Sequence, residues 1–302
     1  KMIIYNNFNI KDKFKNSVLA IGNFDGLHKG HQKVLNQAKL RARRNNLRAG
    51  CLTFEPVPVM FFNKKIKNHR LSTLNQKIEL LKKQNLDFVI IVKFNKKFSN
   101  LTADEFIKKI IYKKLKSKFV LVSRNFKFGK NREGDIKKLK HNEKIYDYKT
   151  EITFPLKKDK LVISSTRIRR LITAGKIQEA NKMLGQNWTL EGKVIRGEQR
   201  GRKIGFPTCN LKLNDYIIPR MGVYSVLVNI GKIIKKGIAN IGYRPTFGKN
   251  SLLLEVNIFG IKKNLYKKSI RVKFIKFIRA EKKFRNIEEL KRQIKKDIKK
   301  IR

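Results

Sequence analysis

The sequence predicts two domains of different fold class, an α/β domain followed by an all-β domain that ends in a helix. Up to about residue 180, short apolar runs alternate with stretches in which apolar residues recur every three or four positions. This pattern is typical of a parallel sheet covered by helices. From about residue 189, the chain consists of segments in which apolar and polar residues alternate, and Gly or Pro residues separate these segments. This pattern is typical of an antiparallel barrel or sandwich. A chain of 302 residues can bury a core in each of two domains.

The α/β domain is predicted from apolar runs and the helical stretches between them. The runs that predict strands are 18–21, 51–54, 88–92, 119–122 and 161–163. The apolar residues at helical spacing are Val34, Leu35, Ala38 and Ala42, then Leu74, Ile78 and Leu81, then Phe106, Ile107 and Ile110.

The all-β domain is predicted from segments with a period of two. These segments are 222–230, 237–242, 252–259 and 270–278. A closing helix is predicted from one apolar stripe, formed by Ile287, Leu290, Ile294 and Ile298. We place the domain boundary near residues 184–189, which gives domains 1–184 and 185–302.

The chain is strongly basic, with 74 Lys and Arg against 22 Asp and Glu and a net charge of +52. One interpretation is a nucleic-acid-binding protein. We favour a basic bias spread over all solvent-facing surfaces, because lysine occurs in nearly every segment and forms no single arm or stripe. The charge should still attract a polyphosphate substrate, and that attraction should weaken as salt is added.

The cysteine and hydropathy patterns indicate a cytoplasmic protein with no membrane partner. Cys51 and Cys209 are far apart and neither belongs to a CxxC pair, so we expect no metal knuckle and no disulfide framework. No apolar run approaches the roughly 18 residues that span a bilayer. The first residues show no secretory signal.

Residues 22–31, GNFDGLHKGH, follow a predicted strand and open a predicted helix. Backbone N–H groups at a helix start have no partner within the helix and suit a phosphate. His28 and His31, three positions apart, can donate hydrogen bonds as charge builds on a phosphate. This arrangement predicts in-line attack on the α-phosphate of ATP. The other candidates for binding ATP here are Gly22, Asn23, Phe24, Asp25 and Gly26.

Two other interpretations of this loop are a glycine-rich turn with incidental histidines and an H-x-x-H metal pair, for which no further ligand stands out. We favour nucleotidyl transfer because half of the four histidines fall in this loop and a second motif, ISSTRIR, accompanies it. Its candidates to cap a helix and contact phosphate are Ser164, Ser165 and Thr166, and its candidates to neutralise the leaving pyrophosphate are Arg167 and Arg169.

A second glycine-rich loop, GRKIGFPTCN at residues 201–210, lies in the β-rich half. It does not match the P-loop pattern, because no GK[ST] follows, but it can cradle phosphates. Thr208 and Asn210 offer the hard oxygen ligands that suit Mg²⁺. Glu255 in the strand 252–259 is either a surface residue or an inward-facing base. The ATP-binding candidates are Gly201, Lys203, Gly205, Pro207, Thr208 and Asn210.

Together these motifs resemble those of bacterial bifunctional riboflavin kinase/FAD synthetases, over essentially the whole chain. In the first half the resemblance lies in GNFDGLHKGH, FEPVP (54–58), NFKFGKNREGD (125–135) and ISSTRIR. In the second half it lies in GRKIGFPTCNL, GVY (222–224), ANIGYRPTFG (239–248), LEVNIF and the closing FRNIEELKRQI.

The resemblance implies a Rossmann-like nucleotidyltransferase domain followed by a six-stranded β-barrel kinase domain with a C-terminal helix. The barrel would phosphorylate riboflavin with ATP and Mg²⁺ to give FMN, with Glu255 as the base and Thr208 and Asn210 holding metal and phosphates. The first domain would move AMP from ATP onto FMN, giving FAD and pyrophosphate. His28 and His31 would stabilise the transferring phosphoryl group.

The chain departs from the pattern of this family at a few positions. Asn125, expected at the flavin or nucleotide pocket, follows Ser123 and Arg124, where the family usually has a glycine and acidic or amide residues. Cys209 stands where alanine is usual, and Lys267 replaces a turn glycine. These departures leave open an enzyme in which only one of the two activities is retained.

Overall fold

A computed structural model of the chain describes residues 1–158, 161–197, 201, 204–244, 251–261 and 263–301. Its contacts divide the chain into two compact units, Lys1–Lys67 with Thr73–Ser165 and Asn68–Ser72 with Thr166–Arg302. The chain therefore passes from one unit to the other three times. The domain boundary expected near residues 184–189 differs from this division, because residues 68–72 and 166–184 make their contacts in the second unit.

The first unit is built on a parallel sheet, as the sequence predicts. Within the described residues its six strands follow the order β1-β4-β3-β2-β5-β6, and all neighbours are parallel. The strands are β1 (Ile3–Tyr5), β2 (Val18–Ile21), β3 (Ala49–Glu55), β4 (Phe88–Lys93), β5 (Phe119–Ser123) and β6 (Lys149–Thr153). The inner strands β2 to β5 contain four of the predicted apolar runs, because a central parallel strand is buried on both faces.

The edges of this sheet differ from the sequence-based expectation. β1 and β6 are the edge strands, and β6 reads KTEIT, which is too polar to be recognised as an apolar run. The predicted run 161–163 instead forms β8 (Leu161–Val162), which pairs with β7 (Lys157–Lys158) in a separate antiparallel ribbon. Leu161 and Val162 are exposed, so an apolar run here does not mark a buried strand.

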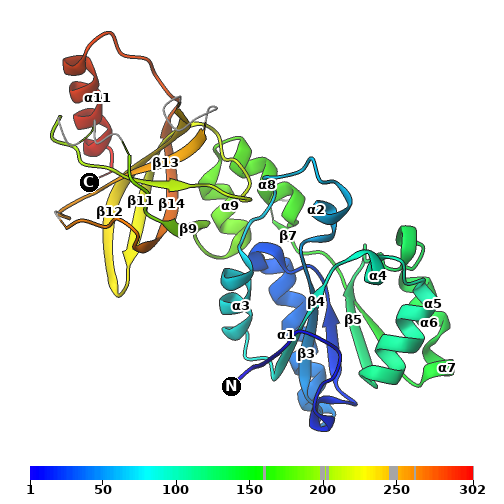
Figure 1. Cartoon of the computed structure of the whole chain (residues 1–302). Helices are drawn as coiled ribbons and strands as arrows, with labels where there is room; N and C mark the ends of the chain where they lie inside the picture. Colours follow the sequence, from blue (N-terminus) through cyan, green and yellow to red (C-terminus); the bar gives the residue numbers. More distant parts are fainter. Residues whose placement is uncertain (159–160, 198–200, 202–203, 245–250, 262, 302) are drawn as a thin grey trace. The chain divides into compact units, whose positions relative to one another are not determined.

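Helices cover both faces of the parallel sheet (Figure 1). α1 (Lys29–Arg44) and α3 (Leu74–Lys82) pack on one face, and the π-helical segment η3 (Phe106–Lys114) and α6 (Ile136–His141) pack on the other. The shorter helical segments are η1 (Asp12–Phe14), η2 (Asp25–Leu27), α2 (Pro58–Phe62), α4 (Lys96–Ser99), α5 (Ala103–Glu105), η4 (Lys130–Arg132) and α7 (Glu143–Tyr146).

The strand order of the first unit reverses at β2. From β2 the chain continues to β3 and β4 on one side, and then to β5 and β6 on the other. At such a reversal the loops after the two adjoining strands separate, and the carboxyl ends of these strands border the usual ligand crevice of an open α/β sheet. The loops that follow β2 and β5 lie at this point.

The second unit contains an antiparallel sheet that nearly closes into a barrel. Within the described residues its six strands follow the order β10-β13-β12-β11-β14-β9. Ile195 pairs with Asn210 across the remaining gap between β9 and β10. The strands are β9 (Thr189–Lys193), β10 (Cys209–Lys212), β11 (Gly222–Ile230), β12 (Ile233–Arg244), β13 (Ser251–Ile258) and β14 (Ser269–Arg279).

Three helices of the second unit are described, and the last is the predicted closing helix. They are α8 (Ser165–Thr173), α9 (Ile177–Leu184) and α11 (Ile287–Lys299). Near α9, the Trp188 and Tyr224 rings pack on Phe274, with ring centroids 4.9 and 5.1 Å away. α11 is attached to β14 by an ion pair of 2.8 Å between Arg279 Nε and Asp297 Oδ2, and Asp297 is only 1% exposed.

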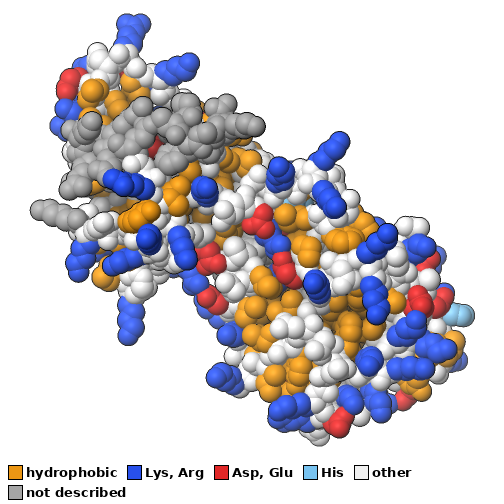
Figure 2. Space-filling model, in the orientation of Figure 1, with side chains coloured by type: hydrophobic (Ala, Val, Ile, Leu, Met, Phe, Trp, Pro, Cys, Tyr) orange, Lys and Arg blue, Asp and Glu red, His pale blue; other side chains and the backbone are white. Residues whose placement is uncertain are grey.

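The basic side chains visible in Figure 2 are spread as the sequence indicates. On the face drawn in Figure 2, Lys and Arg are scattered among apolar and neutral side chains and form no continuous stripe. Among the described residues, no helix is long and apolar enough to cross a membrane.

Candidate active sites

The loop after β2 brings His28 and His31 into ring contact at the start of α1. His28 is the N-cap residue, and its Nδ1 accepts a hydrogen bond of 3.2 Å from the backbone N–H of His31. The two rings stack, with centroids 3.6 Å apart and planes 18° apart. Because Nδ1 is the acceptor, the neutral His28 ring carries its proton on Nε2. The cap therefore fixes His28 as a hydrogen-bond donor through Nε2.

Glycine and left-handed backbone shape this loop. Phe24 and Gly26 have φ of 49° and 71°, which folds the chain tightly between β2 and α1. A Cβ on Gly30 would lie 3.0 Å from Cε1 of His28, so a larger residue would fit only if that ring shifted slightly. Phe24 is buried, and its ring meets the His31 ring edge-on at 5.4 Å. The predicted glycine-rich character thus serves close packing around the histidines.

The remaining residues of this loop fall into buried and exposed groups. Asp25 and Gly26 are buried, Gly22 is half-buried and Asn23 is exposed. The backbone carbonyl of Asn23 accepts a hydrogen bond of 2.9 Å from the Thr53 hydroxyl, which ties the loop to β3. Among the described residues, no group of three or more His, Cys, Asp and Glu could hold a metal ion, so none forms around this histidine pair.

The loop after β5 lies on the other side of the strand-order reversal. Arg124 and Asn125 form an exposed turn, in which the N–H of Phe126 donates to the carbonyl of Ser123 at 2.9 Å. Arg124 lies over the Phe154 ring, 5.6 Å from its centroid. The sheet thus places the turn of Asn125 and the histidine loop after adjoining strands.

The ISSTRIR motif is divided between the two units. Ser164 and Ser165 belong to the first unit, with Ser164 directly before α8, and both are half-buried. Thr166, which is exposed, and Arg167 and Arg169, which are half-buried, belong to the second unit. Nε of Arg169 donates a hydrogen bond of 2.7 Å to the backbone carbonyl of His69, in the same unit.

The second glycine-rich loop leads into a pocket of about 670 Å³ at the seam of the barrel. Lys203 lies outside the described residues. A Cβ on Gly201 would lie 2.4 Å from the carbonyl of Phe206, whereas Gly205, at φ 86°, needs glycine for its backbone conformation. Pro207 and Thr208 line the pocket and are exposed.

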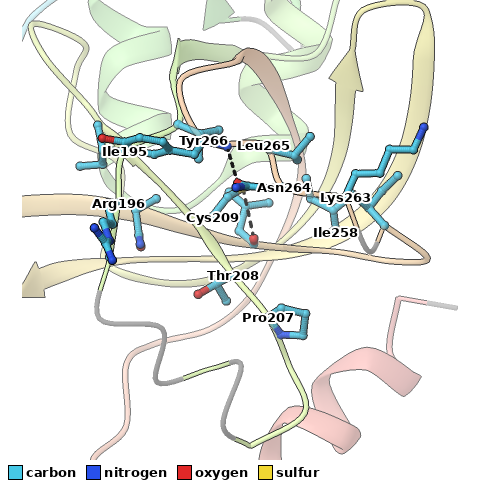
Figure 3. Close-up of a pocket in the computed structure, with 15 residues that line it drawn as sticks. Ile195, Arg196, Pro207, Thr208, Cys209, Ile258, Lys263, Asn264, Leu265 and Tyr266 are labelled. Atoms are coloured by element: carbon cyan, nitrogen blue, oxygen red, sulfur yellow. Dashed lines mark hydrogen bonds between the residues drawn. The ribbon is translucent and has the colours of Figure 1, made fainter.

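The pocket combines polar groups at one end of β10 with apolar side chains (Figure 3). Its walls come from the segment after β9, the segment entering β10, β13, and the loop after β13. The apolar lining residues are Val194, Ile195, Val256, Ile258, Ile261 and Leu265. In the loop, the N–H of Tyr266 donates to Oδ1 of Asn264 at 2.9 Å, which fixes a tight turn beside the pocket. A half-apolar, half-polar hollow of this size suits a nucleotide or flavin ring with an attached phosphate.

Asn210 and Glu255 are directly paired across β10 and β13, and Asn240 of β12 pairs with Glu255 from the other side. Opposed residues in adjacent antiparallel strands put their side chains on one face, with Cβ atoms about 5 Å apart. Asn210 is 6% exposed, and its Oδ1 is buried with no hydrogen-bond partner. A buried amide oxygen without a partner is costly in a protein interior and is a suitable ligand for a hard cation.

Two departures from the family pattern are explained locally. Cys209 is half-buried on the pocket wall, and burial raises the pKa of its thiol to about 12, so it stays protonated and acts as a small apolar side chain. Lys267, which replaces a turn glycine, adopts φ of 63°, in the region that favours glycine. Its N–H still donates to the carbonyl of Val194 at 2.9 Å, so the turn closes despite the substitution.

Sequence reasoning overlooked an aromatic cluster that includes the helix α2, next to the carboxyl ends of β3 and β4. The rings of Phe61, Phe62 and Phe94 meet edge-on at 5.3 to 5.6 Å, and Phe62 is 66% exposed. An exposed aromatic ring offers a face on which a flat ligand ring can stack. The sequence signal that could have revealed this cluster is the run MFF (60–62), which comes shortly after the motif FEPVP.

Comparisons with known proteins identify the family of both halves of the chain. Residues 10–167 match the family model described as FAD synthetase, and residues 184–302 match the one described as riboflavin kinase. A bifunctional riboflavin kinase/FMN adenylyltransferase of Buchnera aphidicola subsp. Schizaphis graminum is 40% identical, over 96% of this chain and 94% of that protein. The protein of the same name from Escherichia coli strain K12 is 36% identical, over 93% and 90%.

A solved structure from Streptococcus pneumoniae that bears the name macrolide-efflux protein has the same fold throughout. Its TM-score is 0.87 at 31% identity, and the match covers 99% of this chain and 98% of that one. The family models and the curated relatives lead to one assignment. The chain belongs to the family of bifunctional riboflavin kinase/FMN adenylyltransferases.

Proposed function

We propose that the two activities use separate sets of residues, with FMN adenylylation assigned to residues 1–184 and riboflavin phosphorylation to residues 185–302. The observation that carries this division is the separation of the two clusters. His28 and His31 stack in the first unit, whereas Asn210 and Glu255 pair in the second. Riboflavin and ATP are the first substrates, and the FMN formed is the acceptor for AMP from a second ATP.

For adenylylation, we assign His28 and His31 to the transferring α-phosphoryl group. The N-cap bond keeps the proton of His28 on Nε2, so this ring donates to a phosphate oxygen as negative charge develops there. The backbone of residues 22–26 and the start of α1 bind the triphosphate. Ser164, Ser165 and Thr166 contact the phosphates, and the guanidinium groups of Arg167 and Arg169 neutralise the departing pyrophosphate. These hydroxyl and guanidinium groups act by positioning the phosphates and neutralising their charge, as expected for phosphoryl transfer.

The acceptor for AMP is the terminal phosphate of FMN, and we assign its flavin ring to the first unit. Asn125 follows β5, next to the loop after β2, and can hydrogen-bond a flavin or nucleotide edge. The exposed Phe62, with Phe61 and Phe94, offers a face on which the isoalloxazine ring can stack.

For phosphorylation, we assign Glu255 as the base that takes the proton from the 5′-hydroxyl of riboflavin. Gly201, Lys203, Gly205 and Pro207 form the loop for the phosphates of ATP. Thr208 and Asn210 fit a Mg²⁺ ion, because the buried Oδ1 of Asn210 has no partner among the described atoms and a hydroxyl oxygen precedes it by two residues. When bound, Mg²⁺ neutralises charge on the phosphates during transfer.

The division is tested by removing each cluster separately. We expect the double substitution His28→Ala and His31→Ala to lower FAD formation at least ~100-fold, because each lost donor to a developing oxyanion costs about that factor. FMN formation should remain within twofold of the unmodified enzyme. We expect Glu255→Ala to abolish FMN formation from riboflavin while supplied FMN is still converted to FAD. The flavins are separated chromatographically after incubation with ATP and Mg²⁺.

The same assay decides whether one activity has been lost in this chain. An unmodified protein that converts FMN to FAD but not riboflavin to FMN, or the reverse, would show a single working site. A folded variant that loses both activities from either substitution set would contradict the division. Circular dichroism of each variant provides the check of folding.

A further inference from the structure

We infer that Asp215, which lies in the riboflavin-kinase half of the sequence, is a positioning residue for FMN adenylylation. It acts through the segment Asn68–Ser72 on Arg169. This inference rests on the role proposed above for Arg169 at the leaving pyrophosphate. Asp215 and the segment lie outside the sequence motifs described above.

The segment Asn68–Ser72 lies in the first half of the sequence, but its contacts group it with the second unit. It lies beside the chain after β10, to which an isolated bridge joins it. Arg70 forms a parallel bridge with Tyr216, and the N–H of Ile217 donates to the carbonyl of Arg70 at 2.8 Å. Nδ2 of Asn68 donates to the carbonyl of Tyr216 at 3.1 Å.

Asp215 holds this segment through both its backbone and its side chain. Its backbone carbonyl accepts from the N–H groups of both His69 and Arg70, at 2.8 and 2.9 Å. Its carboxylate forms an ion pair with Nε of Arg70, whose side chain is only 9% exposed. A guanidinium at that depth needs a partner, because an unpaired buried charge is strongly unfavourable. The carboxylate therefore helps to hold Arg70, and through it the backbone of residues 69–70, in place.

The backbone held in this way is the one that orients Arg169. The carbonyl of His69 accepts the bond from Nε of Arg169 at 2.7 Å. A guanidinium is planar and rigid, so one hydrogen bond at Nε sets the direction of its other N–H groups. Leu71, two residues after His69, is fixed as well, because its carbonyl accepts a hydrogen bond of 3.1 Å from Nε1 of the buried Trp188. The segment is thus anchored on both sides of the carbonyl that Arg169 binds.

The test compares both activities in the full-length enzyme. We expect Asp215→Ala to lower kcat for FAD formation about tenfold, since small displacements of a positioned group already cost up to ~100-fold. FMN formation should stay within twofold, which shows that the second unit is folded. Asp215→Glu should restore FAD formation, because the carboxylate is 40% exposed and a longer side chain can be accommodated.

The double variant with Arg169→Ala identifies the route of the effect. If Asp215 acts through Arg169, the double variant should lose no more FAD formation than Arg169→Ala alone. Asp297→Ala is the matched control, because it also removes a carboxylate from an arginine of the second unit. It should leave the ratio of the two activities unchanged.

The outcomes separate this inference from the proposed function. If Arg169→Ala leaves FAD formation intact, the proposed role of Arg169 is wrong. If Arg169→Ala lowers FAD formation but Asp215→Ala does not, the proposed function stands and the inference is overturned. Multiplicative losses in the double variant, or equal losses of both activities in Asp215→Ala, would also overturn it.

Discussion

At the scale of single residues, Lys267 shows where this chain accepts backbone strain. Its φ of 63° lies in the left-handed region, which costs a residue with a Cβ about 1–2 kcal/mol relative to glycine. The turn nevertheless closes, because the N–H of Lys267 and the carbonyl of Val194 keep their hydrogen bond. Lysine at position 267, where the family pattern has glycine, therefore costs stability but leaves the turn closed.

This explanation predicts that Lys267→Gly stabilises the protein. We expect the free energy of unfolding to rise by about 0.5–1 kcal/mol, because the relief of strain exceeds the greater chain entropy of glycine in the unfolded state. The matched control is Lys268→Gly, since Lys268 is exposed and has no positive φ. That change should lower the free energy of unfolding. Denaturant titrations of both variants make the comparison, and equal effects would contradict it.

At the scale of elements, the periodicity of the sequence predicted where the helices and inner strands lie. It did not predict the long-range contacts that hold these elements together. The stripe Val34, Leu35, Ala38 and Ala42 is buried in α1 as predicted. In α11 the apolar stripe is only partly buried, and Ile287 is 58% exposed. The buried residue of that helix is Asp297, which a hydropathy pattern treats as a surface residue. Its partner Arg279 lies 18 positions away, beyond the reach of local periodicity.

The site residues show the same limit. Glu255 could be read from the sequence as either a surface residue or a base, because strand alternation does not say which residue lies opposite. The register with Asn210 supplies that information, and it depends on how β10 and β13 pair. Asn240 and the segment Asn68–Ser72 were not recognised for the same reason: their partners are distant in sequence and become neighbours only through folding.

The attachment of α11 leads to a prediction for Asp297. We expect Asp297→Ala to lower the free energy of unfolding by about 3 kcal/mol, since it leaves the guanidinium of Arg279 without its carboxylate partner. Gln293 also loses the oxygen to which its Nε2 donates at 2.9 Å. Replacing both partners, by Asp297→Leu with Arg279→Met, should recover most of the loss. Chemical denaturation measures both, and a full loss in the double variant would contradict the ion-pair explanation.

At the scale of the whole molecule, the net charge of +52 acts on folding and on substrate binding in opposite ways. Like charges scattered over a surface repel one another and destabilise the compact state. The same field attracts ATP, whose charge is negative. Neither effect needs a nucleic-acid partner, and no continuous basic stripe is visible on the face in Figure 2.

Both effects are screened by salt, since the Debye length falls from about 30 Å at 0.01 M to about 10 Å at 0.1 M. We therefore expect added sodium chloride over this range to raise the thermal unfolding midpoint by a few degrees while it raises KM for ATP in both reactions. Potassium chloride should act equally, whereas sulfate is avoided because it can occupy the phosphate sites and stabilise by binding. Thermal unfolding and initial rates on one preparation measure the two trends. If the midpoint and KM do not rise together, the scattered charge is not the common cause, and a localised basic site becomes the better explanation.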